Sequence, residues 1–456
     1  MKIPLSPPPL DQLFKGFSTE SPDRLVHILT KRIGPEPNGN YFHWDQLRHR
    51  TPPEGLSHED WWFAIKQARL VIKKEIGLVD PKDEEFGLVL TEGLHRKLHQ
   101  IDRDAGGAIK AGAPIAVIAS KENRDRYIIK SLFEEAITSS QLEGASTTTS
   151  EAKKMLRSGR KPRDRGEQMI LNNYRAMRFV RENRQEPLSE DFLLELHVIL
   201  TEDAMDDPSA SGRWRRADED IIVADNRDGT ILYRPPPADL IPDRMKKVIE
   251  FANSEQDESF IHPVVQAVIL HFMLSYEHPF ADGNGRTARA LFYWFMSRTG
   301  YWLIEFLSIS KVIKQSPTTY AKAFLYVETD DNDLTYFLHQ QFDVITKSIA
   351  ALHKYLSKKT REIQETEQLL RGPVQKVLNH RQVAVVSHAL KNPSHLYDIQ
   401  SHQISHGISY QTARTDLLGL EDLGLLSKFK RGNAFVFQSP QDISGRITDL
   451  NRMLTL

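Results

Sequence analysis

The sequence predicts a mainly α-helical protein, and three observations support this prediction. Apolar residues recur at spacings of three and four in several long segments, among them GEQMILNNYRAMRFVREN and SEDFLLELHVILTEDAM. In a central stretch, IIVADNRDGTILYR, apolar and polar residues instead alternate on both sides of Asp228 and Gly229, as in two short strands joined by a turn. This pattern predicts a β-hairpin over residues 221–234. The 456 residues are 40% hydrophobic and 27% charged, which is enough for a large buried core.

Composition and charge exclude several classes of protein. Lys and Arg total 60 and Asp and Glu total 61, so the net charge is -1. The chain as a whole therefore has no electrostatic attraction to nucleic acid or to a membrane surface. The absence of cysteine excludes disulfides, a thiolate nucleophile and a cysteine-based zinc site. The start MKIPLSPPPL lacks the apolar stretch of a secretion signal, and the longest apolar run, 264–276, is shorter than the roughly 20 residues that span a bilayer. We therefore expect a soluble, cytoplasmic protein without a membrane partner.

The chain is expected to divide into five segments. These are an N-terminal helical region of unknown role at 1–120, a helical domain at 121–358, a linker at 359–372, a second domain at 373–440 and a tail at 441–456. Trp44, Trp61 and Trp62 are expected to lie in the core of the first segment, because large aromatic rings dominate buried area. The basic run RSGRKPRDR, 157–165, is interpreted as a solvated loop between helices.

The most informative stretch is HPFADGNGRTAR, residues 278–289, which raises an electrostatic question. Its glycine-flanked turn leads into a helix start, yet Arg286 and Arg289 fall in the first turn, where the helix dipole is already positive. An anionic partner would make this arrangement favourable.

This stretch differs from two known phosphate-binding motifs and from a zinc motif. GNGRTA matches a dinucleotide fingerprint, with Glu305 at 20 residues beyond Gly285 where a ribose-binding acid would lie. Such a turn must follow a short buried strand, whereas the preceding apolar segment is long and starts with Pro263, as a helix does. The sequence contains neither GxxxxGK[ST] nor HExxH. A calcium loop in the hairpin lacks the regular acidic spacing.

The side chains of residues 278–289 suit a metal-bound polyphosphate. Gly283 and Gly285 permit close backbone approach, so that successive N–H groups form an anion-binding cup. The polar groups of the stretch are the neutral-pH base His278, the carboxylate Asp282, which suits Mg²⁺, the donor Asn284, and the phosphate-clamping Arg286 and Arg289.

This stretch resembles, over its full length, the signature HPFx(D/E)GNGRxxR of Fic-domain proteins, which transfer AMP from ATP to a protein hydroxyl. The resemblance extends from about residue 122 to about 355 and includes the SGRWR stretch at 211–215 and the hairpin. It implies a Fic-type helical domain with a β-hairpin flap.

The resemblance assigns roles to the matching residues. His278 would deprotonate the hydroxyl of a target Ser, Thr or Tyr, and Asp282 would hold Mg²⁺. Phe280 would anchor the loop in the core. The residues that would bind the phosphates of ATP are Gly283, Asn284, Gly285, Arg286 and Arg289.

The hairpin gains a role in the same way. Fic proteins use this flap to align a target segment by strand addition, so Ile231, Leu232 and Tyr233 are expected to dock the target. The alternative is an ordinary surface hairpin.

A second misplaced charge lies in SSQLEG, residues 139–144. The helix expected over 122–143 ends at Gly144, which puts Glu143 at a helix carboxyl terminus, where negative charge is disfavoured. The stretch resembles the (S/T)xxxE(G/N) inhibitory motif of Fic proteins, matched by Ser139, Glu143 and Gly144. The resemblance implies that Glu143 pairs with Arg289 and occupies the position of the γ-phosphate.

The C-terminal segment is predicted to be a winged helix-turn-helix. Residues 373–438 read as helix, helix, turn, helix and hairpin, and they carry seven Lys or Arg against four acids, a balance of +3. DNA would contact the third helix and the wing KFKRGN through Tyr410, Gln411, Thr412, Arg414, Lys430 and Arg431. A protein-interaction or dimerisation module is the alternative.

Together these features predict an autoinhibited, Mg²⁺- and ATP-dependent protein adenylyltransferase. Its partners would be ATP and a hydroxyl-bearing target protein, with self-modification and a homodimer allowed by the resemblance. Two alternatives remain open: a transcriptional regulator whose nucleotide site only senses ATP, and an enzyme that uses Glu143 to remove AMP from its targets.

Overall fold

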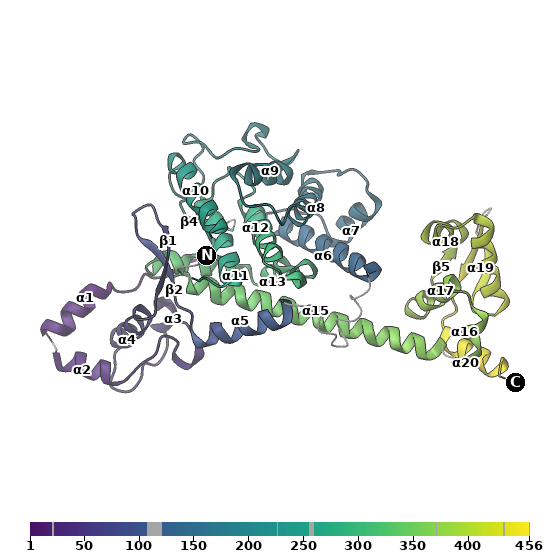
Figure 1. Ribbon diagram of the computed structural model, residues 1–456, viewed down its shortest axis with the longest axis horizontal. Helices are drawn as coiled ribbons and strands as arrows, with labels where there is room; N and C mark the ends of the chain where they lie inside the picture. The colour runs from purple at the N-terminus through teal and green to yellow at the C-terminus, as the bar shows by residue number, and fades with distance from the viewer. Residues whose placement is uncertain are drawn as a thin grey trace. The chain divides into compact units, whose positions relative to one another are not determined.

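The computed structural model of the chain describes residues 1–20, 22–106, 121–225, 227–254, 260–370, 372–431 and 434–455. The described residues up to His353 form one compact unit, called unit 1 below, and those from Lys354 onward belong to a second, unit 2. The prediction of a mainly α-helical fold is confirmed: in the described ranges, strands occur only in two two-stranded sheets and one three-stranded sheet (Figure 1).

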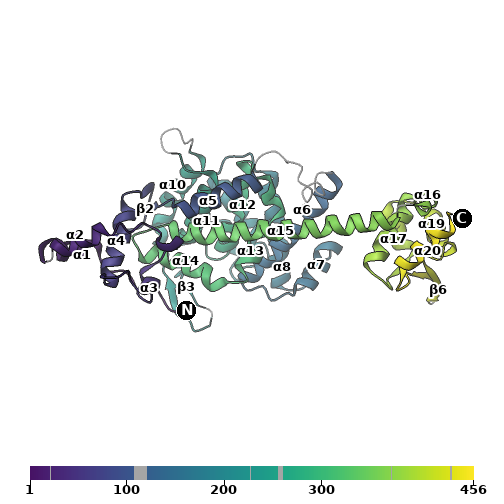
Figure 2. The ribbon, with the colours of Figure 1, turned by 90° about the horizontal axis from the view of Figure 1, so that it is seen from below.

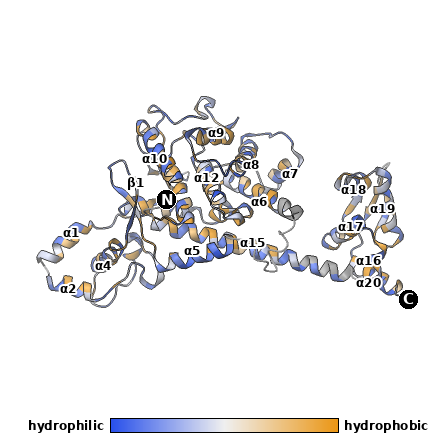
Figure 3. Cartoon of the chain, in the orientation of Figure 1, coloured by the Kyte–Doolittle hydropathy of each residue, from blue (hydrophilic) through white to orange (hydrophobic). Residues whose placement is uncertain are grey.

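The first hundred residues combine short helices with a hairpin. The helices are α1 (Leu10–Lys15), α2 (Pro22–Thr30), α3 (Trp44–Leu47), α4 (His58–Leu70) and α5 (Glu92–Ala105). Trp44, Trp61 and Trp62 are buried, as predicted. The hairpin β1 (Lys74–Val79) and β2 (Glu85–Leu88) was not predicted from the sequence, although its apolar residues alternate around a turn at 80–84. In Figure 3 α5 is mostly blue, because only one of its faces is buried.

The next helices surround the motif in unit 1. They are α6 (Lys121–Leu142), α7 (Thr149–Ser158), α8 (Arg165–Glu182), α9 (Glu190–Thr201) and α10 (Ile241–Asn253). The predicted hairpin is present as β3 (Val223–Ala224) and β4 (Ile231–Tyr233), which pair antiparallel. Short 3-10 segments occur at Pro37–Gly39, Pro208–Ala210, Ala238–Leu240 and Trp302–Phe306.

The core of unit 1 is the helix pair α11 (Pro263–Glu277) and α12 (Asn284–Arg298), which Figures 1 and 2 show among α6, α8, α9 and α10. Almost every residue of both helices is buried, so neither has a polar face toward water. The pair is followed by α13 (Ile309–Ile313), α14 (Pro317–Thr329) and α15 (Thr335–Leu370). Phe272 of α11 packs on Phe324 of α14 and Phe337 of α15, with ring centroids 5.3 Å apart in both pairs. In the part of the chain that the structure describes, no helix has the length and apolar character needed to cross a membrane.

A buried polar network connects the N-terminal helices to α14 and α15 within unit 1. Lys66 of α4 donates to Asp330 at 2.6 Å, and the Asp330 carboxylate also accepts from the Tyr336 hydroxyl at 2.6 Å. Arg69 donates to the same hydroxyl at 2.9 Å, and its guanidinium stacks on Tyr41 at 3.5 Å. A buried charge is tolerated when it is paired and hydrogen-bonded in this way. The network holds the end of α14 and the start of α15 against the N-terminal region.

Unit 2 contains several short helices and a three-stranded sheet around one core. The helices α16 (Pro373–Val377), α17 (His380–Lys391), α18 (Ile399–His406) and α19 (Tyr410–Asp422) are followed by the hairpin β6 (Ser427–Arg431) and β7 (Ala434–Gln438), and β5 (Leu396–Asp398) pairs with β7. Buried Asp416 of α19 accepts from Arg381 and Asn379 and lies 3.2 Å from His402, which connects α17, α18 and α19.

The structure differs from the expected segments at both ends of this region. Residues 359–370, expected as a linker, continue α15. Residues 441–456, expected as a tail, contain α20 (Ile443–Met453), whose Ile443 and Ile447 are buried in the core of unit 2. This segment has too few regularly spaced apolar residues to predict a helix, and packing on the core of unit 2 stabilises α20. The expected boundary at residues 120 and 121 adjoins residues 107–120, which lie outside the described ranges.

Candidate active site

The motif forms a tight connection between the two central helices. Helix α11 ends at Glu277, His278 follows with φ 48° and ψ 55°, and α12 begins at Asn284 after Gly283, whose φ is 84°. A positive φ is rare outside glycine, so the backbone at His278 is held there by the surrounding structure. The imidazole therefore leaves the helix axis at the point where the chain turns.

The His278 imidazole has a defined tautomer. Its Nδ1 lies 3.2 Å from the Ser275 carbonyl oxygen, which only accepts hydrogen bonds, so Nδ1 carries the hydrogen. Nε2 is then unprotonated and available as a base. Burial lowers the pKa of His278 below its usual value of 6.5, so the ring is neutral at pH 7.

The backbone of the loop is held by neighbouring side chains. Phe280 is fully buried and stacks on His197 of α9, with ring centroids 3.8 Å apart. The Asn284 side chain bonds the N–H of Phe280 at 2.9 Å and its carbonyl oxygen at 2.8 Å. His197 Nε2 donates to the carbonyl oxygen of Asp282 at 2.9 Å, and its Nδ1 accepts from the N–H of Gly212 at 3.0 Å. These bonds fix the loop before any ligand arrives.

Arg286 is buried beneath the loop with unused hydrogen-bonding capacity. It is 1% exposed, and its Nη1 donates to the Leu200 carbonyl oxygen at 2.8 Å. Within the described residues its Nε and Nη2 have no hydrogen-bond acceptor, and Nη2 lies 3.6 Å from an Asp282 oxygen. Burial lowers the pKa of Arg286, which remains charged. Unsatisfied buried donors are costly, and an anion placed here would satisfy them.

Arg289 is fully engaged by α6. Its Nε donates to the Ser139 hydroxyl at 2.8 Å, and its Nη2 donates to the Glu143 carboxylate at 2.7 Å and to the Ser139 carbonyl oxygen at 3.2 Å. Gly144 follows with φ 95° and ends the helix, as a C′ glycine does. The expected contact between Arg289 and Glu143 is present, but Arg289, expected in the first turn of its helix, is the sixth residue of α12 and lies in the second turn.

The Glu143 carboxylate also occupies the space above Gly285. A Cβ added to Gly285 would overlap Glu143 Oε1 and displace the carboxylate, so Glu143 can lie this close to the loop only where residue 285 is glycine. Burial alone would raise the pKa of Glu143, but the charge and hydrogen bond of Arg289 more than offset it and hold the pKa below its usual value. Glu143 is therefore an anion lying on the phosphate-binding cup that the sequence predicts.

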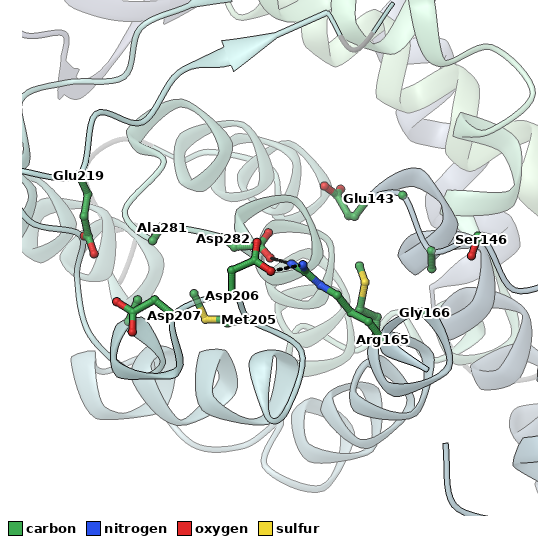
Figure 4. A pocket seen from close by; sticks show the side chains of 14 residues that line it. Glu143, Ser146, Arg165, Gly166, Met205, Asp206, Asp207, Glu219, Ala281 and Asp282 are labelled. Carbon is green, nitrogen blue, oxygen red and sulfur yellow. Dashed lines mark hydrogen bonds and ion pairs between the residues drawn. The ribbon is translucent and has the colours of Figure 1, made fainter. Parts of the chain in front are cut away.

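A pocket of about 700 Å³ opens beside the loop. In Figure 4 the Arg165 side chain of α8 points toward Asp206 and Asp282, and Glu143 lies apart from these three residues. Arg165 pairs with Asp206 at 2.5 Å and lies 3.6 Å from Asp282. Asp282 Oδ1 accepts from the N–H of Gly283 at 2.6 Å. Among the described residues Oδ2 has only ion-pair partners at 3.6 Å, so this pocket-lining oxygen has no close hydrogen bond from them.

The hairpin lies next to the end of α11. The Tyr233 hydroxyl donates to the Tyr276 carbonyl oxygen at 2.9 Å, and the two rings lie 5.2 Å apart. Ile231 is 38% exposed and Leu232 is intermediate in exposure. β4 pairs with β3 on one edge, so its second edge is available to another strand in the described part of the sheet.

The residues predicted to contact DNA belong to unit 2. Tyr410 is 54% exposed, and Gln411 and Arg414 are also exposed on the first turns of α19. Thr412 is partly buried and bonds Ser409, which caps the helix. Lys430 is exposed on β6, whereas the Arg431 side chain and residues 432 and 433 lie outside the described part of the chain.

Sequence reasoning missed three residues at this site. His197 and Arg215 hold the carbonyl groups of the loop, and Arg165 of the basic run, expected in a solvated loop, lines the pocket. Arg160 of the same run pairs with Glu167 at 2.5 Å. SGRWR was noted only for its position before the motif, and its unusual density of arginines was the available signal for Arg215.

Comparisons with known proteins relate part of this chain to one family. Residues 187–296 match the family model described as Fic/DOC family. A protein adenylyltransferase Fic of Nematostella vectensis is 27% identical over 218 residues, which cover 45% of this chain and 47% of that protein. Protein adenylyltransferase fic-1 of Caenorhabditis elegans is 31% identical over 130 residues, covering 28% of this chain and 23% of that protein. The chain thus spans half or less of the length of these curated relatives.

Among solved structures, a Fic family protein from Desulfovibrio desulfuricans G20 is 17% identical, with a TM-score of 0.47, and the match covers 75% of this chain and 95% of that one. The matched residues of the family model include the whole connection from His278 to Arg289 with its neighbours His197 and Arg215. The chain therefore contains a Fic/DOC family domain.

Proposed function

We propose that this chain transfers AMP from ATP to a hydroxyl group of a target protein and is inhibited by its own Glu143. The oxygen of a Ser, Thr or Tyr side chain attacks the α-phosphorus, the bond from that phosphorus to the β-phosphate bridging oxygen breaks, and pyrophosphate leaves. The hydroxyl proton passes to His278. The relatives named protein adenylyltransferase support this assignment at the level of the family.

The observation that carries the proposal is the unsatisfied guanidinium of Arg286 under a cup closed by Glu143. Nε and Nη2 of Arg286 are buried donors without an acceptor among the described residues, and Glu143 is an anion already bound at Gly285 and Arg289. Donors at a helix N-terminus together with two arginines suit a polyphosphate. Phosphoryl transfer needs mainly positioning and charge neutralisation, which this cup supplies.

The residues present also fit Mg²⁺. In the described ranges there is no group of three or more His, Asp or Glu side chains that could hold a metal ion by themselves. Mg²⁺ needs only one or two carboxylates when phosphate oxygens complete its shell, and Asp282 presents one such oxygen to the pocket. The ion would neutralise charge on the leaving pyrophosphate.

His278 fits the role of general base. The bond from Nδ1–H to the Ser275 carbonyl leaves Nε2 unprotonated, and the lowered pKa keeps it so at neutral pH. The target hydroxyl would be presented by a segment added to the free edge of β4, in the mode that the flap of Fic proteins uses.

The inhibition is tested by replacing Glu143. Glu143→Gly removes the carboxylate from Gly285 and frees Arg289, so the rate of AMP transfer from labelled ATP is expected to rise at least about tenfold, since one charge-assisted contact is worth about 1.5–3 kcal/mol. Glu143→Gln, which keeps the bulk but loses the charge, should give a smaller increase. The rate is measured as label incorporated into protein from ATP with Mg²⁺.

The matched control is Glu182→Gly, because Glu182 is an exposed acid at the last position of α8 and contacts only Arg178 in the described residues. It should leave the rate unchanged. A Glu143→Gly protein that labels neither itself nor any protein of a cell extract would contradict adenylyl transfer and favour a nucleotide sensor.

We further propose that unit 2 is a winged helix that binds DNA. The exposed start of α19 and the hairpin β6–β7 suit a recognition helix and a wing. Arg414→Ala is expected to weaken binding of duplex DNA and to reduce the slope of log affinity against log salt by about one. Fluorescence anisotropy of the full chain on a duplex at several salt concentrations measures both, and Lys391→Ala, on another helix of unit 2, is the control. Equal affinity of both variants and the parent would favour a protein-interaction module.

A further inference from the structure

Arg215 makes three bonds that join separate parts of unit 1. Its N–H donates to the Pro279 carbonyl oxygen at 2.8 Å, its Nε donates to the His278 carbonyl oxygen at 2.8 Å, and its Nη2 donates to the carbonyl oxygen of Pro236. Pro236 lies three residues after β4, where the chain leaves the hairpin. One side chain thus connects the backbone of the candidate base with the exit of the hairpin.

The guanidinium of Arg215 is placed at an electrostatic cost. Arg215 is 7% exposed, yet its side-chain bonds go to neutral carbonyl groups, and none of the ion pairs found among the described residues involves it. The nearby carboxylate of Glu277 is taken by Arg244 at 2.6 Å. Burying a charge without a carboxylate partner is unfavourable for stability. The arrangement is better explained by the effect of the Arg215 guanidinium on His278 and Pro236, whose carbonyl oxygens accept its two hydrogen bonds.

The bond to His278 acts on a strained position. His278 has a φ of 48°, and in this conformation its carbonyl oxygen accepts from Arg215 Nε. The neighbouring ring bond from Nδ1 to Ser275 depends on the same backbone geometry. Loss of the Arg215 bond would therefore let the imidazole leave the orientation in which Nε2 faces the reacting atoms.

We propose that Arg215 is a positioning residue that couples the hairpin to His278, so that a target segment bound along the hairpin is aligned with the base. The inference rests on the proposed adenylyl transfer. Because Pro236 and His278 share one guanidinium, a shift of the hairpin exit changes the bond that holds the base. Arg215 contacts no reacting atom itself, so its effect should appear in turnover rather than in nucleotide affinity.

The test compares Arg215→Gln and Arg215→Lys in the Glu143→Gly background. Arg215→Gln is expected to lower kcat at least tenfold, while KM for ATP and calorimetric affinity for MgATP stay within twofold. Burial lowers the pKa of His278 and the Arg215 charge acts in the same direction, so the acid limb of the kcat/KM profile should move to higher pH in Arg215→Gln. Arg215→Lys keeps the charge but lacks the planar fork, so this limb should stay in place while kcat still falls.

Arg216→Gln is the matched control, because Arg216 is the next residue and its side chain is exposed. It should behave as the parent. A parental kcat in Arg215→Gln, or a loss confined to KM for ATP, would overturn the proposal. If Arg215→Gln does not fold, the test uses Arg215→Lys alone. A parental kcat in that variant would overturn the proposal that hydrogen bonds to the His278 and Pro236 carbonyl oxygens position the base.

Failure of the proposed function is distinguishable from failure of this inference. Without transfer by the Glu143→Gly parent the proposed function is wrong, yet hydrogen exchange still tests the positioning. Amide exchange in a peptide covering residues 276–283 should accelerate in Arg215→Gln and not in Arg216→Gln. Equal exchange in the two variants would overturn the positioning role whatever the activity.

Discussion

Replacing His278 by alanine in the Glu143→Gly protein is expected to lower the rate of AMP transfer by about 10²–10⁴-fold, the usual contribution of a positioned general base. The ring is neutral and its Nε2 is unprotonated, so it is the group in this loop that would accept the hydroxyl proton. Asp282, Arg286 and Arg289 are unchanged in this variant, and calorimetric binding of MgATP should therefore be retained. The measurement is the initial rate of label transfer at pH 7.5.

The control for this variant is His95→Ala, an exposed histidine of α5. It should transfer AMP at the parental rate. Transfer by His278→Ala within about threefold of the parent would show that the hydroxyl is deprotonated by another group and would remove His278 from the mechanism. Loss of MgATP binding as well would instead place His278 in nucleotide binding.

Mild acid is expected to unfold unit 1. His43, His197 and His271 are fully buried, and burial lowers their pKa values to about 4, about 4 and about 3. Because the folded protein binds fewer protons than the unfolded chain between these values and 6.5, this contribution to stability is complete above pH 6.5 and is lost as the pH falls toward 4. Each histidine contributes about 1.4 kcal/mol per pH unit, or roughly 6 kcal/mol for three between pH 6.5 and 5, which is comparable to the stability of a typical protein.

Urea unfolding followed by tryptophan fluorescence at pH 7.5, 6.5, 5.8 and 5 measures this dependence, since all six tryptophans belong to unit 1. His43→Gln should have a shallower slope than the parent, by about 1.4 kcal/mol per pH unit. His99→Gln replaces an exposed histidine and should keep the parental slope. A free energy of unfolding that is constant between pH 7.5 and 5 would mean that these histidines are not held neutral by burial.

Local signals in the sequence predicted most helices and the loop between them. The spacing of apolar residues located α8, α9 and α11, the glycine-flanked turn marked the start of α12, and Gly144 marked the end of α6. Asp228 and Gly229 located the hairpin, whose pairing of β3 with β4 the structure shows. By contrast, β1 and β2 lie in a region expected to be helical, because four to six residues of alternation are too few to outweigh the helical pattern around them.

The charged pair Glu143 and Arg289 could also be recognised from the sequence, because position near a helix end is a local property. Glu143 lies at the end of α6, where the helix dipole disfavours a negative charge, and this can be recognised from sequence position alone. Arg289 lies one turn into α12, and the structure shows the two side chains 2.7 Å apart. His197 and Arg165 carry no such signal: one lies on an amphipathic helix among apolar residues, and the other lies in a run of basic residues. Both contact Asp282, which lies 85 positions after His197 and 117 positions after Arg165.

The sequence by itself determined which residues could bind phosphate and supply a base, because HPFADGNGRTAR places a histidine, a carboxylate, glycines and arginines within twelve residues. Only the tertiary structure decided how those residues are held: Arg286 with two unsatisfied donors, Glu143 over Gly285, and the loop carbonyls on His197 and Arg215. The reason is physical, since periodicity and capping act within a few residues, whereas burial and hydrogen-bond partners arise from packing between segments distant in the chain.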